Sequence, residues 1–427
     1  MKIITVAIAG LGPRGFHMYG KYQLLHPERM KVTALADPDE EKLKEARRVL
    51  GVPEENCYRS AEEMFSLPRL ADVAFIATQD AQHLAHATAA LEKGYDLLLE
   101  KPIATTLKDC FGIMNKSLEC NKRVIVCHVL RYTTFYRTIK ELIEGGRVGD
   151  IVNVDAVENV GYWHQAHSFV RGNWRNSDQS SPMILAKCCH DLDILNFLTG
   201  KRCVSLNSYG STKFFVRKNM PSDAAERCLD CKYRDECVYS AKRIYLSGDS
   251  LERYEWLCYV VAQPPTFDNL EDALKLGPYG RCVFCCDNNV VDHQTVNIRY
   301  EDDVTATLTM SAFSQNSYRT IRIMGTAGEI EGNQDTNIIR YTRFGEAPVY
   351  YDIKKIATDL SGHGGGDNAM LADFFRTLDE GGDMSSSIIR SMQSHIMAFA
   401  AEDSRVEGGK NIDLEEFEKI NNCGVKR

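Results

Sequence analysis

The sequence predicts an α/β protein with two domains: a doubly wound parallel sheet over residues 1–128, and an α+β domain with a large open antiparallel sheet over residues 129–427. Three observations support this architecture. Short apolar runs alternate with helical patterns through the first of these regions, which is typical of a parallel sheet covered by helices. A glycine-rich turn follows the first apolar run. Beyond residue 150, strand patterns follow one another without helices between them, which favours an antiparallel sheet.

Composition limits the class of partner. The chain has 427 residues, of which 44% are hydrophobic and 26% are charged, and its formal net charge is -8. A negative balance without a basic block argues against nucleic acid or an anionic membrane as partner, so a small molecule is expected. No apolar run approaches the roughly 18 residues that would cross a bilayer. Fifteen cysteines without secretory features indicate thiols or metal ligands, and the predicted location is the cytoplasm.

The first predicted strand, residues 3–9, runs directly into a glycine-rich turn. The turn reads Gly10-Leu11-Gly12-Pro13-Arg14-Gly15, which is G-x-G-x-x-G between a strand and a helical stretch. In that context the glycines let the backbone turn and approach a pyrophosphate at the start of the helix. The motif therefore predicts a Rossmann domain that binds a dinucleotide.

The second predicted strand, residues 31–36, ends in Asp37, one helical stretch after the glycine-rich turn. A carboxylate at this place accepts hydrogen bonds from the adenosine ribose and repels a 2'-phosphate, which favours NAD over NADP. The alternative is that Asp37-Pro38-Asp39 only caps the helix that follows. Both roles are compatible with the sequence.

The third and fourth predicted strands end in polar groups. Residues 73–77 stop at Thr78, and a helix that carries His83 follows; His83 is equally well explained as a surface imidazole. Residues 95–99 end in Glu100-Lys101-Pro102, where the proline keeps Lys101 extended at the end of the strand. Charged groups that terminate a buried strand predict a site, although a plain turn is the alternative. A last strand at residues 123–127 completes the domain.

In order and spacing, these motifs resemble those of the Gfo/Idh/MocA oxidoreductases, the family of glucose-fructose oxidoreductase and inositol dehydrogenase. The motifs are Ala9-Gly10-Leu11-Gly12, Ala36-Asp37, Ile76-Ala77-Thr78 with His83, Gly94, and Glu100-Lys101-Pro102. The resemblance implies that Lys101 contacts both the nicotinamide ribose and the substrate, and that the Lys101–Pro102 peptide is cis. The predicted cofactor-binding residues are Gly10, Gly12, Arg14, Gly15, Asp37, Thr78, His83, Glu100 and Lys101.

The predicted second domain contains the catalytic helix. Lys187, His190 and Asp191 share one face of a helix, and a histidine beside a lysine and a carboxylate is a proton-transfer unit. The alternative is a polar cluster that only caps and pairs. The stretch resembles the catalytic helix of the family, with His190 as its histidine. The acid usually found four residues earlier is Ala186 here, so Lys187 is expected to replace it in part.

A stretch at residues 161–175 is rich in aromatic rings, histidines and arginines. Such side chains make a poor core but a good carbohydrate surface, and a structural aromatic loop is the alternative. The predicted substrate-binding residues are Trp163, His164, His167, Arg171 and Trp174 from this stretch, with Arg131 and Asp191. The segment His363-Gly364-Gly365-Gly366-Asp367 resembles family segments near the active cleft.

Residues 214–288 are predicted to be an insertion, because the strand pattern stops there and cysteines appear in two C-x2-C pairs. The spacing fits a structural tetrahedral zinc site with Cys228, Cys231, Cys237 and Cys282 as ligands. Cys285 or Cys286 is an alternative fourth ligand. An iron–sulfur cluster is the second choice of metal group. The third alternative is reduced cysteines without metal, because the second cysteine pair is far from the first in the sequence.

The predicted activity is NAD-dependent oxidoreduction at a secondary hydroxyl of a sugar, glycoside or cyclitol, with Lys101, His190 and Lys187 as catalytic residues. The alternative is a glycoside hydrolase that retains NAD and oxidises the sugar transiently, as some relatives of the resembling family do. A regulatory protein that binds the cofactor is disfavoured. The family resemblance also implies a homodimer or homotetramer, paired through the open face of the second sheet.

Overall fold

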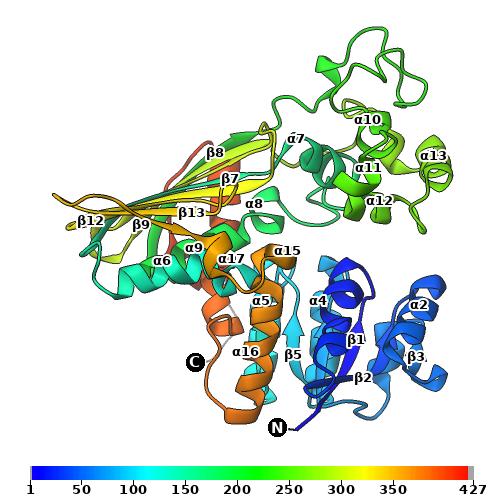
Figure 1. Cartoon of the computed structure of the whole chain (residues 1–427), viewed down its shortest axis with the longest axis horizontal. Coiled ribbons are helices and arrows are strands. Elements are labelled where there is room, and N and C mark those ends of the chain that lie inside the picture. The colour runs from blue at the N-terminus through cyan, green and yellow to red at the C-terminus, as the bar shows by residue number, and fades with distance from the viewer. Residues whose placement is uncertain (1, 422–427) are drawn as a thin grey trace.

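In the computed structural model, which describes residues 2–421, the N-terminal region forms a six-stranded parallel sheet in the order β3-β2-β1-β4-β5-β6 (Figure 1). Its strands are β1 (Ile4–Ala9), β2 (Met30–Ala36), β3 (Cys57–Tyr58), β4 (Val73–Ile76), β5 (Asp96–Leu99) and β6 (Val124–Val126). The strand order turns back between β1 and β4, and a ligand of such a sheet lies at this point, beyond the carboxyl ends of the strands. The glycine turn after β1 is at that edge.

Helices cover both faces of this sheet, so each strand is buried on both sides. The elements are η1 (Pro13–Gly20), α1 (Tyr22–Leu25), α2 (Glu40–Leu50), η2 (Glu54–Asn56), α3 (Ala61–Ser66), η3 (Asp80–Gln82), α4 (His83–Glu92) and α5 (Leu107–Glu119). One further helix on this sheet comes from the far end of the chain. Phe374 and Phe375 of α16 (Gly366–Glu380) pack in one core with Val6 and Phe75 of β1 and β4.

The second sheet has nine strands in the order β14-β13-β12-β11-β7-β10-β9-β8-β15. They are β7 (Ile151–Asn159), β8 (Cys203–Ser211), β9 (His293–Tyr300), β10 (Thr305–Ser311), β11 (Tyr318–Gly325), β12 (Gly328–Asn333), β13 (Ile338–Arg343), β14 (Val349–Asp352) and β15 (Ile412–Asp413). All neighbouring pairs are antiparallel except β7 with β10, which run parallel. The sheet is therefore mixed. β7 and β10 run parallel, and all of the remaining neighbouring pairs are antiparallel, as predicted.

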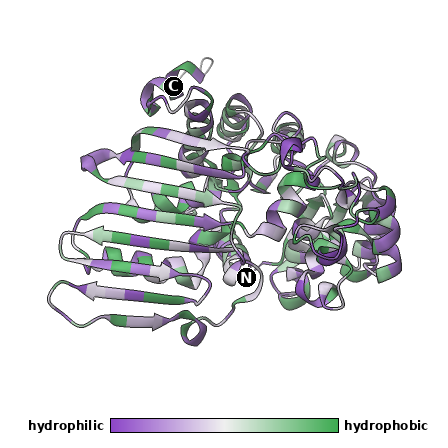
Figure 2. Ribbon diagram, turned by 90° about the horizontal axis from the view of Figure 1, so that it is seen from above, coloured by the Kyte–Doolittle hydropathy of each residue, from purple (hydrophilic) through white to green (hydrophobic). Residues whose placement is uncertain are grey.

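Helices lie on one face of this sheet, and Figure 2 shows the other face uncovered (Figures 1 and 2). The remaining elements here are η4 (Val129–Tyr132), α6 (Thr134–Glu144), α7 (Tyr162–His164), η5 (Gln165–Arg171), α8 (Met183–Ala186), α9 (Cys189–Thr199), η8 (Glu301–Asp303), α14 (Ile353–Ile356), α15 (Ser361–Gly364), α17 (Ile388–Val406) and α18 (Leu414–Asn421). The uncovered face carries polar ladders, such as Asp155 with Thr307 and Arg322 with Glu329. Residues 422–427 of the predicted second domain lie outside the described part.

The cysteine-rich segment lies between β8 and β9 and contains helices and loops. Its helical elements are η6 (Arg217–Asn219), α10 (Ala241–Tyr245), α11 (Ser250–Arg253), α12 (Glu255–Val261), α13 (Phe267–Leu276) and η7 (Pro278–Gly280). It has a separate hydrophobic core and reaches across to the first domain. There the Tyr259 hydroxyl donates to Glu45 at 3.3 Å and its ring meets that of His17 edge-on. The segment therefore bridges the two domains on one side.

Within residues 2–421, every helix is too short or too polar to cross a membrane.

Candidate active site

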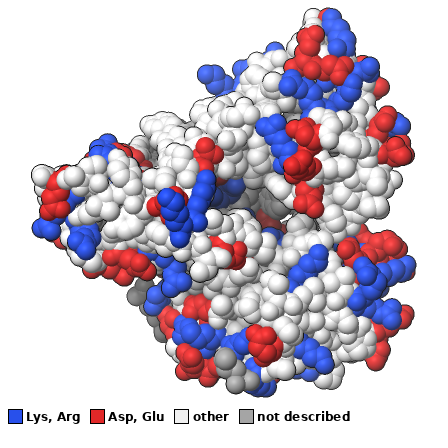
Figure 3. Space-filling model, in the orientation of Figure 1, with Lys and Arg blue, Asp and Glu red and all other residues white. Residues whose placement is uncertain are grey.

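Figure 3 shows a hollow in the centre of one face, between the second sheet, the cysteine-rich segment and the first domain, with charged side chains inside it. The carboxyl ends of β1, β4 and β5 reach this region from the first domain. From the second domain, α8 and α9 approach it, and Lys101 after β5 donates to the Ala186 carbonyl of α8 at 2.9 Å. The two halves of the predicted site therefore come together here.

The glycine turn fits a dinucleotide. Gly10 has φ +89°, and a Cβ at this position would lie 2.3 Å from the Ala77 carbonyl oxygen. A Cβ at Gly15 would lie 1.8 Å from the Gly10 carbonyl oxygen, so both positions require glycine for close packing. A Cβ at Gly12 would meet no atom within 4 Å, so Gly12 borders open space at the start of η1. That is the place where the backbone would approach a pyrophosphate.

Asp37 braces the glycine turn. Its carboxylate accepts from the Leu11 backbone N–H at 2.7 Å and from that of Asp39 at 2.9 Å, and the residue is 7% exposed. The side chain that caps α2 is Asp39, which accepts from the N–H groups of Glu41 and Lys42. The stretch Asp37-Pro38-Asp39 therefore does cap the helix, through Asp39, while Asp37 itself remains at the glycine turn. Its position at the end of β2 fits the ribose-binding role.

Arg14 lies in a cluster of polar side chains between the end of β5 and the start of α16. Its guanidinium forms ion pairs with Glu100 at 2.6 Å and with Asp367 of α16 at 2.5 Å, and the Tyr19 hydroxyl bonds to Glu100 as well. Burial opposes ionisation of Glu100, but the charges of Arg14 and Lys101 hold the pKa of this carboxyl below its usual value. Arg14 and Glu100, predicted to bind the cofactor, therefore join β5, η1 and α16 through a charged network.

His83 and Thr78 shape the same edge of the sheet. The fully buried His83 lies between two carbonyls, with Nδ1 at 2.8 Å from Pro102 O and Nε2 at 3.2 Å from Thr78 O. It is therefore not a surface imidazole, because its ring joins the ends of β4 and β5. The Thr78 hydroxyl pairs with His86 Nδ1 at 3.0 Å. The Lys101–Pro102 peptide is cis, as the family resemblance implied.

His190 lies at the start of α9, where it is 6% exposed. Burial, followed by the charge of Lys101 and the neighbouring His128, holds the pKa of His190 well below its usual value. Its ring is 5.6 Å from that of His128 and 6.3 Å from that of His363, and Nδ1 has no hydrogen-bond partner among residues 2–421. The imidazole is therefore in its neutral form at neutral pH, the form that a proton acceptor needs.

Lys187, next to the predicted catalytic helix, has a carboxylate partner on another element. Glu158 of β7 is fully buried and pairs with Lys187 Nζ at 3.3 Å and with Arg319 Nε at 2.8 Å. Arg319 in turn pairs with Asp191 at 2.7 Å. Neither Glu158 nor Arg319 stands out in the sequence, because each occupies an ordinary position in an alternating strand. Lys187 therefore has a carboxylate partner from an earlier strand of the chain.

Two residues of the predicted aromatic stretch, Trp163 and His164, lie near Lys187 and Lys101. Burial and the charges of Lys187, His167 and Lys101 hold the pKa of His164 well below its usual value. The Trp163 ring stacks on His164 and also contacts Tyr254 and Trp256 of the cysteine-rich segment. Trp163, His164 and Trp256 therefore form one group of rings in mutual contact, referred to below as the aromatic wall, where the cysteine-rich segment meets the second domain.

The other predicted substrate residues are occupied elsewhere. His167 Nδ1 lies 2.8 Å from the Tyr245 hydroxyl, and Arg171 is fully buried among backbone carbonyls of the cysteine-rich segment. Trp174 donates to Asp80 of the first domain at 3.0 Å. Arg131 makes a two-pronged ion pair with Asp193, with both N–O distances 2.6 Å. These four side chains hold segments of the protein together. Asp191, in contrast, pairs with Arg319 and so lies next to Glu158.

Arg319 and His363 line a polar cavity of about 340 Å³. The cavity therefore lies next to Glu158, which pairs with Arg319, and to His190, whose ring is near that of His363. Thr133, Gln334 and Asp335 also line the cavity. Hydroxyl, amide and carboxylate groups around a space of this size suit a small polyhydroxylated molecule.

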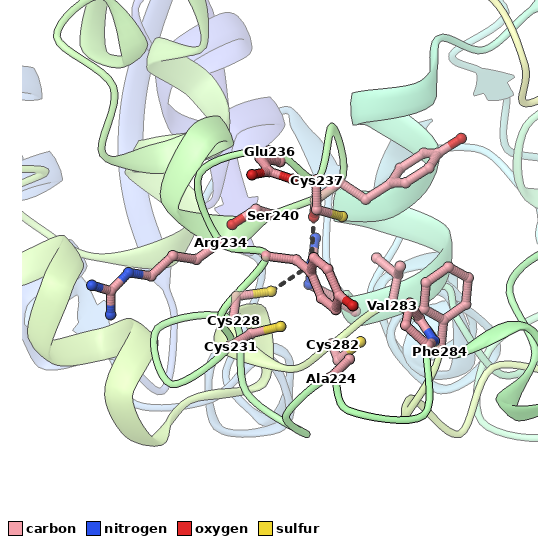
Figure 4. A pocket seen from close by; sticks show the side chains of 14 residues that line it. Ala224, Cys228, Cys231, Arg234, Glu236, Cys237, Ser240, Cys282, Val283 and Phe284 are labelled. Carbon is pink, nitrogen blue, oxygen red and sulfur yellow. Dashed lines mark hydrogen bonds between the residues drawn. The ribbon is translucent and has the colours of Figure 1, made fainter.

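The predicted zinc ion has no preformed site. Among residues 2–421, no three His, Cys, Asp or Glu side chains are placed so that they could hold a metal ion. The four predicted ligands, Cys228, Cys231, Cys237 and Cys282, nevertheless line a single cavity of about 270 Å³ (Figure 4). Their thiols are close in space but not arranged for coordination.

Family models match most of the chain. The model for "Oxidoreductase family, NAD-binding Rossmann fold" matches residues 4–128, and that for "Oxidoreductase family, C-terminal alpha/beta domain" matches residues 140–414. Among curated proteins, the "Putative oxidoreductase YteT" of Bacillus subtilis is 25% identical over 398 residues, which cover 87% of this chain and 88% of that protein. An alpha-N-acetylgalactosaminidase of Bacteroides fragilis is 24% identical over 273 residues, which cover 58% of this chain and 59% of that enzyme.

Solved structures show the same fold. Levoglucosan dehydrogenase in complex with NADH superposes with a TM-score of 0.71 at 18% identity, over 97% of this chain and 99% of that chain. An inositol dehydrogenase homologue from Azotobacter vinelandii with NAD+ superposes with a TM-score of 0.68 at 17% identity, over 96% and 97%. At these identities the comparison establishes the fold.

Proposed function

The chain belongs to the Gfo/Idh/MocA oxidoreductase family, as the matches over residues 4–128 and 140–414 show, and from this premise we propose that it oxidises a secondary hydroxyl of a sugar, glycoside or cyclitol. The observation that carries the proposal is the contact of Lys101, at the end of β5, with the Ala186 carbonyl, which brings the strand ends beyond the glycine turn next to the segment that carries His190. NAD bound at these strand ends supplies the hydride acceptor.

Protein groups perform the proton chemistry in this proposal. His190 accepts the hydroxyl proton as the carbon–hydrogen bond breaks and a ketone forms. Lys101, held at the cleft by its bond to the Ala186 carbonyl, favours a neutral imidazole and donates to the substrate oxygen. Lys187 belongs to the same centre through Glu158, and we propose that it orients a neighbouring hydroxyl. Asp37 selects NAD over NADP.

The substrate site that we propose extends from His190 toward the polar cavity lined by Arg319, with the aromatic wall Trp163, His164 and Trp256 on the opposite side. Polar groups on one side and rings on the other suit a sugar, which has hydroxyls at its edge and apolar faces. Arg131, His167 and Arg171 are left out of this site, because their polar atoms already bond within the protein.

A panel of sugars, glycosides and cyclitols incubated with NAD tests the proposal. Net accumulation of NADH with a member of the panel is the expected result. The second candidate, a hydrolase that retains NAD, is favoured by the partial likeness to the alpha-N-acetylgalactosaminidase. Release of free sugar without net NADH would establish that candidate, and neither signal with any compound would contradict both.

Three further features belong to the proposal. We infer a homodimer or homotetramer that pairs through the uncovered face of the nine-stranded sheet, a cytoplasmic location, and a structural zinc ion in the cysteine-rich segment. Sedimentation, cell fractionation and elemental analysis test them separately.

A further inference from the structure

The cavity of the cysteine-rich segment holds a buried cation whose partners are neutral groups. Arg171 is 0% exposed, and its Nε donates to the Arg281 carbonyl at 2.7 Å and its Nη2 to the Tyr239 carbonyl at 2.7 Å. Nη1 is buried and has no hydrogen-bond partner, and no carboxylate pairs with this guanidinium within residues 2–421. Guanidinium groups stay charged in proteins, and a buried charge without a counter-charge is costly. An anion beside this guanidinium is therefore expected.

The groups able to supply that charge are thiols. Arg171 Nη2 lies 3.4 Å from Cys228 Sγ, and the guanidinium lines the same cavity as Cys228, Cys231, Cys237 and Cys282 (Figure 4). Glu236 also lines the cavity but forms no ion pair with Arg171 in the described chain. Thiols become thiolates when they bind a metal, and four thiolates around zinc(II) carry a net charge of about -2. Such a centre would give Arg171 its counter-charge.

The backbone brings the four thiols together despite their separation in sequence. The Cys228 N–H donates to the Gly280 carbonyl at 2.9 Å and the Cys282 N–H to the Glu226 carbonyl at 2.8 Å, around an antiparallel bridge between Arg227 and Arg281. Residues 226, 228, 280 and 282 therefore share one face of this bridge. Backbone pairing thus closes the long sequence gap between the two cysteine pairs.

A tight turn brings the second thiol to the same place. The Cys231 N–H bonds to the Cys228 carbonyl at 3.3 Å, so the C-x2-C pair lies in one turn, and Cys237 follows in the next loop. Cys285 and Cys286 lie outside the cavity lining: Cys285 contacts Arg217 and Met220, and Cys286 donates to the Cys282 carbonyl. Of these three cysteines only Cys282 lines the cavity, so Cys282 is the candidate for the fourth ligand.

We propose that Cys228, Cys231, Cys237 and Cys282 bind one zinc(II) as thiolates, and that Arg171 is the buried counter-cation of this centre. On binding, each thiol releases its proton to solvent and the side chains rotate toward the ion, which closes the cavity. Zinc(II) fits because it accepts four sulfur ligands with tetrahedral geometry and undergoes no redox change. The centre is independent of the oxidoreductase reaction, since no ligand belongs to the proposed active site.

Elemental analysis of the full chain, purified without chelator, tests the site. About one zinc per chain is expected. Cys231→Ser and Cys282→Ser are expected to lose it, and their cysteine-rich segment should become sensitive to limited proteolysis within residues 214–288. Two matched controls, Cys258→Ser and Cys285→Ser, change cysteines of the same segment outside the cavity lining and are expected to retain zinc.

Arg171 is tested by the affinity for zinc, measured by competition with a chromogenic chelator. Arg171→Gln is expected to weaken zinc binding about 10- to 100-fold, as for other groups that support metal ligands, and Arg171→Lys to weaken it less. If Arg171→Gln fails to fold, cobalt(II) reconstitution of the unsubstituted chain gives the second measurement, with thiolate-to-cobalt absorption as the expected result. A chain that contains no metal and takes up neither ion, iron with visible absorption, or zinc retained in both ligand variants would overturn the proposal.

Discussion

Glu158 is the carboxylate that pairs with both Lys187 and Arg319 in the proposed active site. It is fully buried between Lys187 and Arg319, and burial raises the pKa of its carboxyl, against the effect of these two cations. The sequence shows that the acid is missing at Ala186 but not where its substitute lies, because the pairing across β7, α9 and β11 exists only after the sheet has formed.

Removal of this charge should destabilise the protein. Glu158→Gln leaves two partly buried cations with one carboxylate, so we expect the free energy of unfolding to fall by about 3 kcal/mol and turnover to fall with it. Urea unfolding followed by circular dichroism measures the first effect. Glu329→Gln, which breaks the exposed pair with Arg322 on the uncovered face of the sheet, is the matched control and should change stability by less than about 1 kcal/mol. Equal effects of the two variants would refute this role.

Lys101 is expected to act on turnover. Lys101→Ala should lower kcat by about 10²- to 10⁴-fold, the range for loss of a group that assists proton transfer. The affinity for NAD, measured by fluorescence titration, should change far less, because the glycine turn and Asp37 remain in place. Lys108→Ala, at an exposed lysine in the helix that follows, should leave both quantities unchanged. A Lys101→Ala variant with near-normal rates would remove Lys101 from the mechanism.

At the scale of elements, the turn after β1 and the end of β2 form one unit, since Asp37 accepts from the Leu11 N–H. Asp37→Ser removes the charge that opposes a 2'-phosphate. The ratio of kcat/KM for NADP to that for NAD should therefore rise at least about tenfold, a change of roughly 1.4 kcal/mol.

Asp39→Ser is the control for that change, because Asp39 caps α2 without touching the glycine turn. A serine retains most of the capping ability, so stability should stay within about 1 kcal/mol and the cofactor ratio should not move. If both variants shift the ratio equally, Asp37 does not read the ribose.

The elements differ in how far their sequence predicts them. Strands β1, β4 and β5 were predictable because each is a short, mostly apolar and buried run, and β2 because its apolar half, residues 34–36, is buried and ends at a carboxylate. Strand β12, with the sequence GEIEGN, lacks that signal, since its glycines and carboxylates are tolerated only by pairing with β11 and β13. The parallel pairing of β7 with β10 was also missed, because the two strands are far apart in the chain and the sequence carries no local sign of their pairing.

The same limit applies to the site. Gly10, Asp37 and Lys101 were predictable because each stands at the end of an apolar strand, where polar groups need an explanation. The partners of Arg171 and Arg131 were not, since a lone arginine in a loop does not show whether it meets a substrate or a carbonyl of its own chain. An arginine that is buried inside the protein bonds to its own chain, and one that is open to solvent can meet a substrate. Which of the two occurs depends on the assembled fold.

At the scale of the whole molecule, buried neutral histidines should make stability depend on pH. Burial is the largest cause that lowers the pKa values of His128, His167, His190 and His395, and those of His167 and His395 fall to about 3. The unfolded chain gains these protons near pH 6.5, whereas the folded chain resists them. Stability is therefore present above about pH 6.5 and falls as the pH drops toward these lower pKa values, by about 1.4 kcal/mol per pH unit for each histidine.

Urea unfolding at about pH 7 and about pH 5.5 measures this slope. His395→Gln should reduce the slope by the share of one histidine. A free energy of unfolding that does not change between the two pH values would contradict the expectation. The Asp72 carboxylate enters only at lower pH, since its pKa is lowered to about 2.

The packing of α16 against β1 and β4 has a consequence for biosynthesis. Phe374 and Phe375 complete a hydrophobic core whose other half lies in the first domain. On the ribosome, these aromatic side chains emerge about 250 residues after the first domain, which is on the order of 12 to 50 s at ordinary rates of translation. We expect Val6, Ile8 and Phe75 to lack these packing partners during that time, so the nascent N-terminal region should need protection from aggregation until the end of the chain is synthesised.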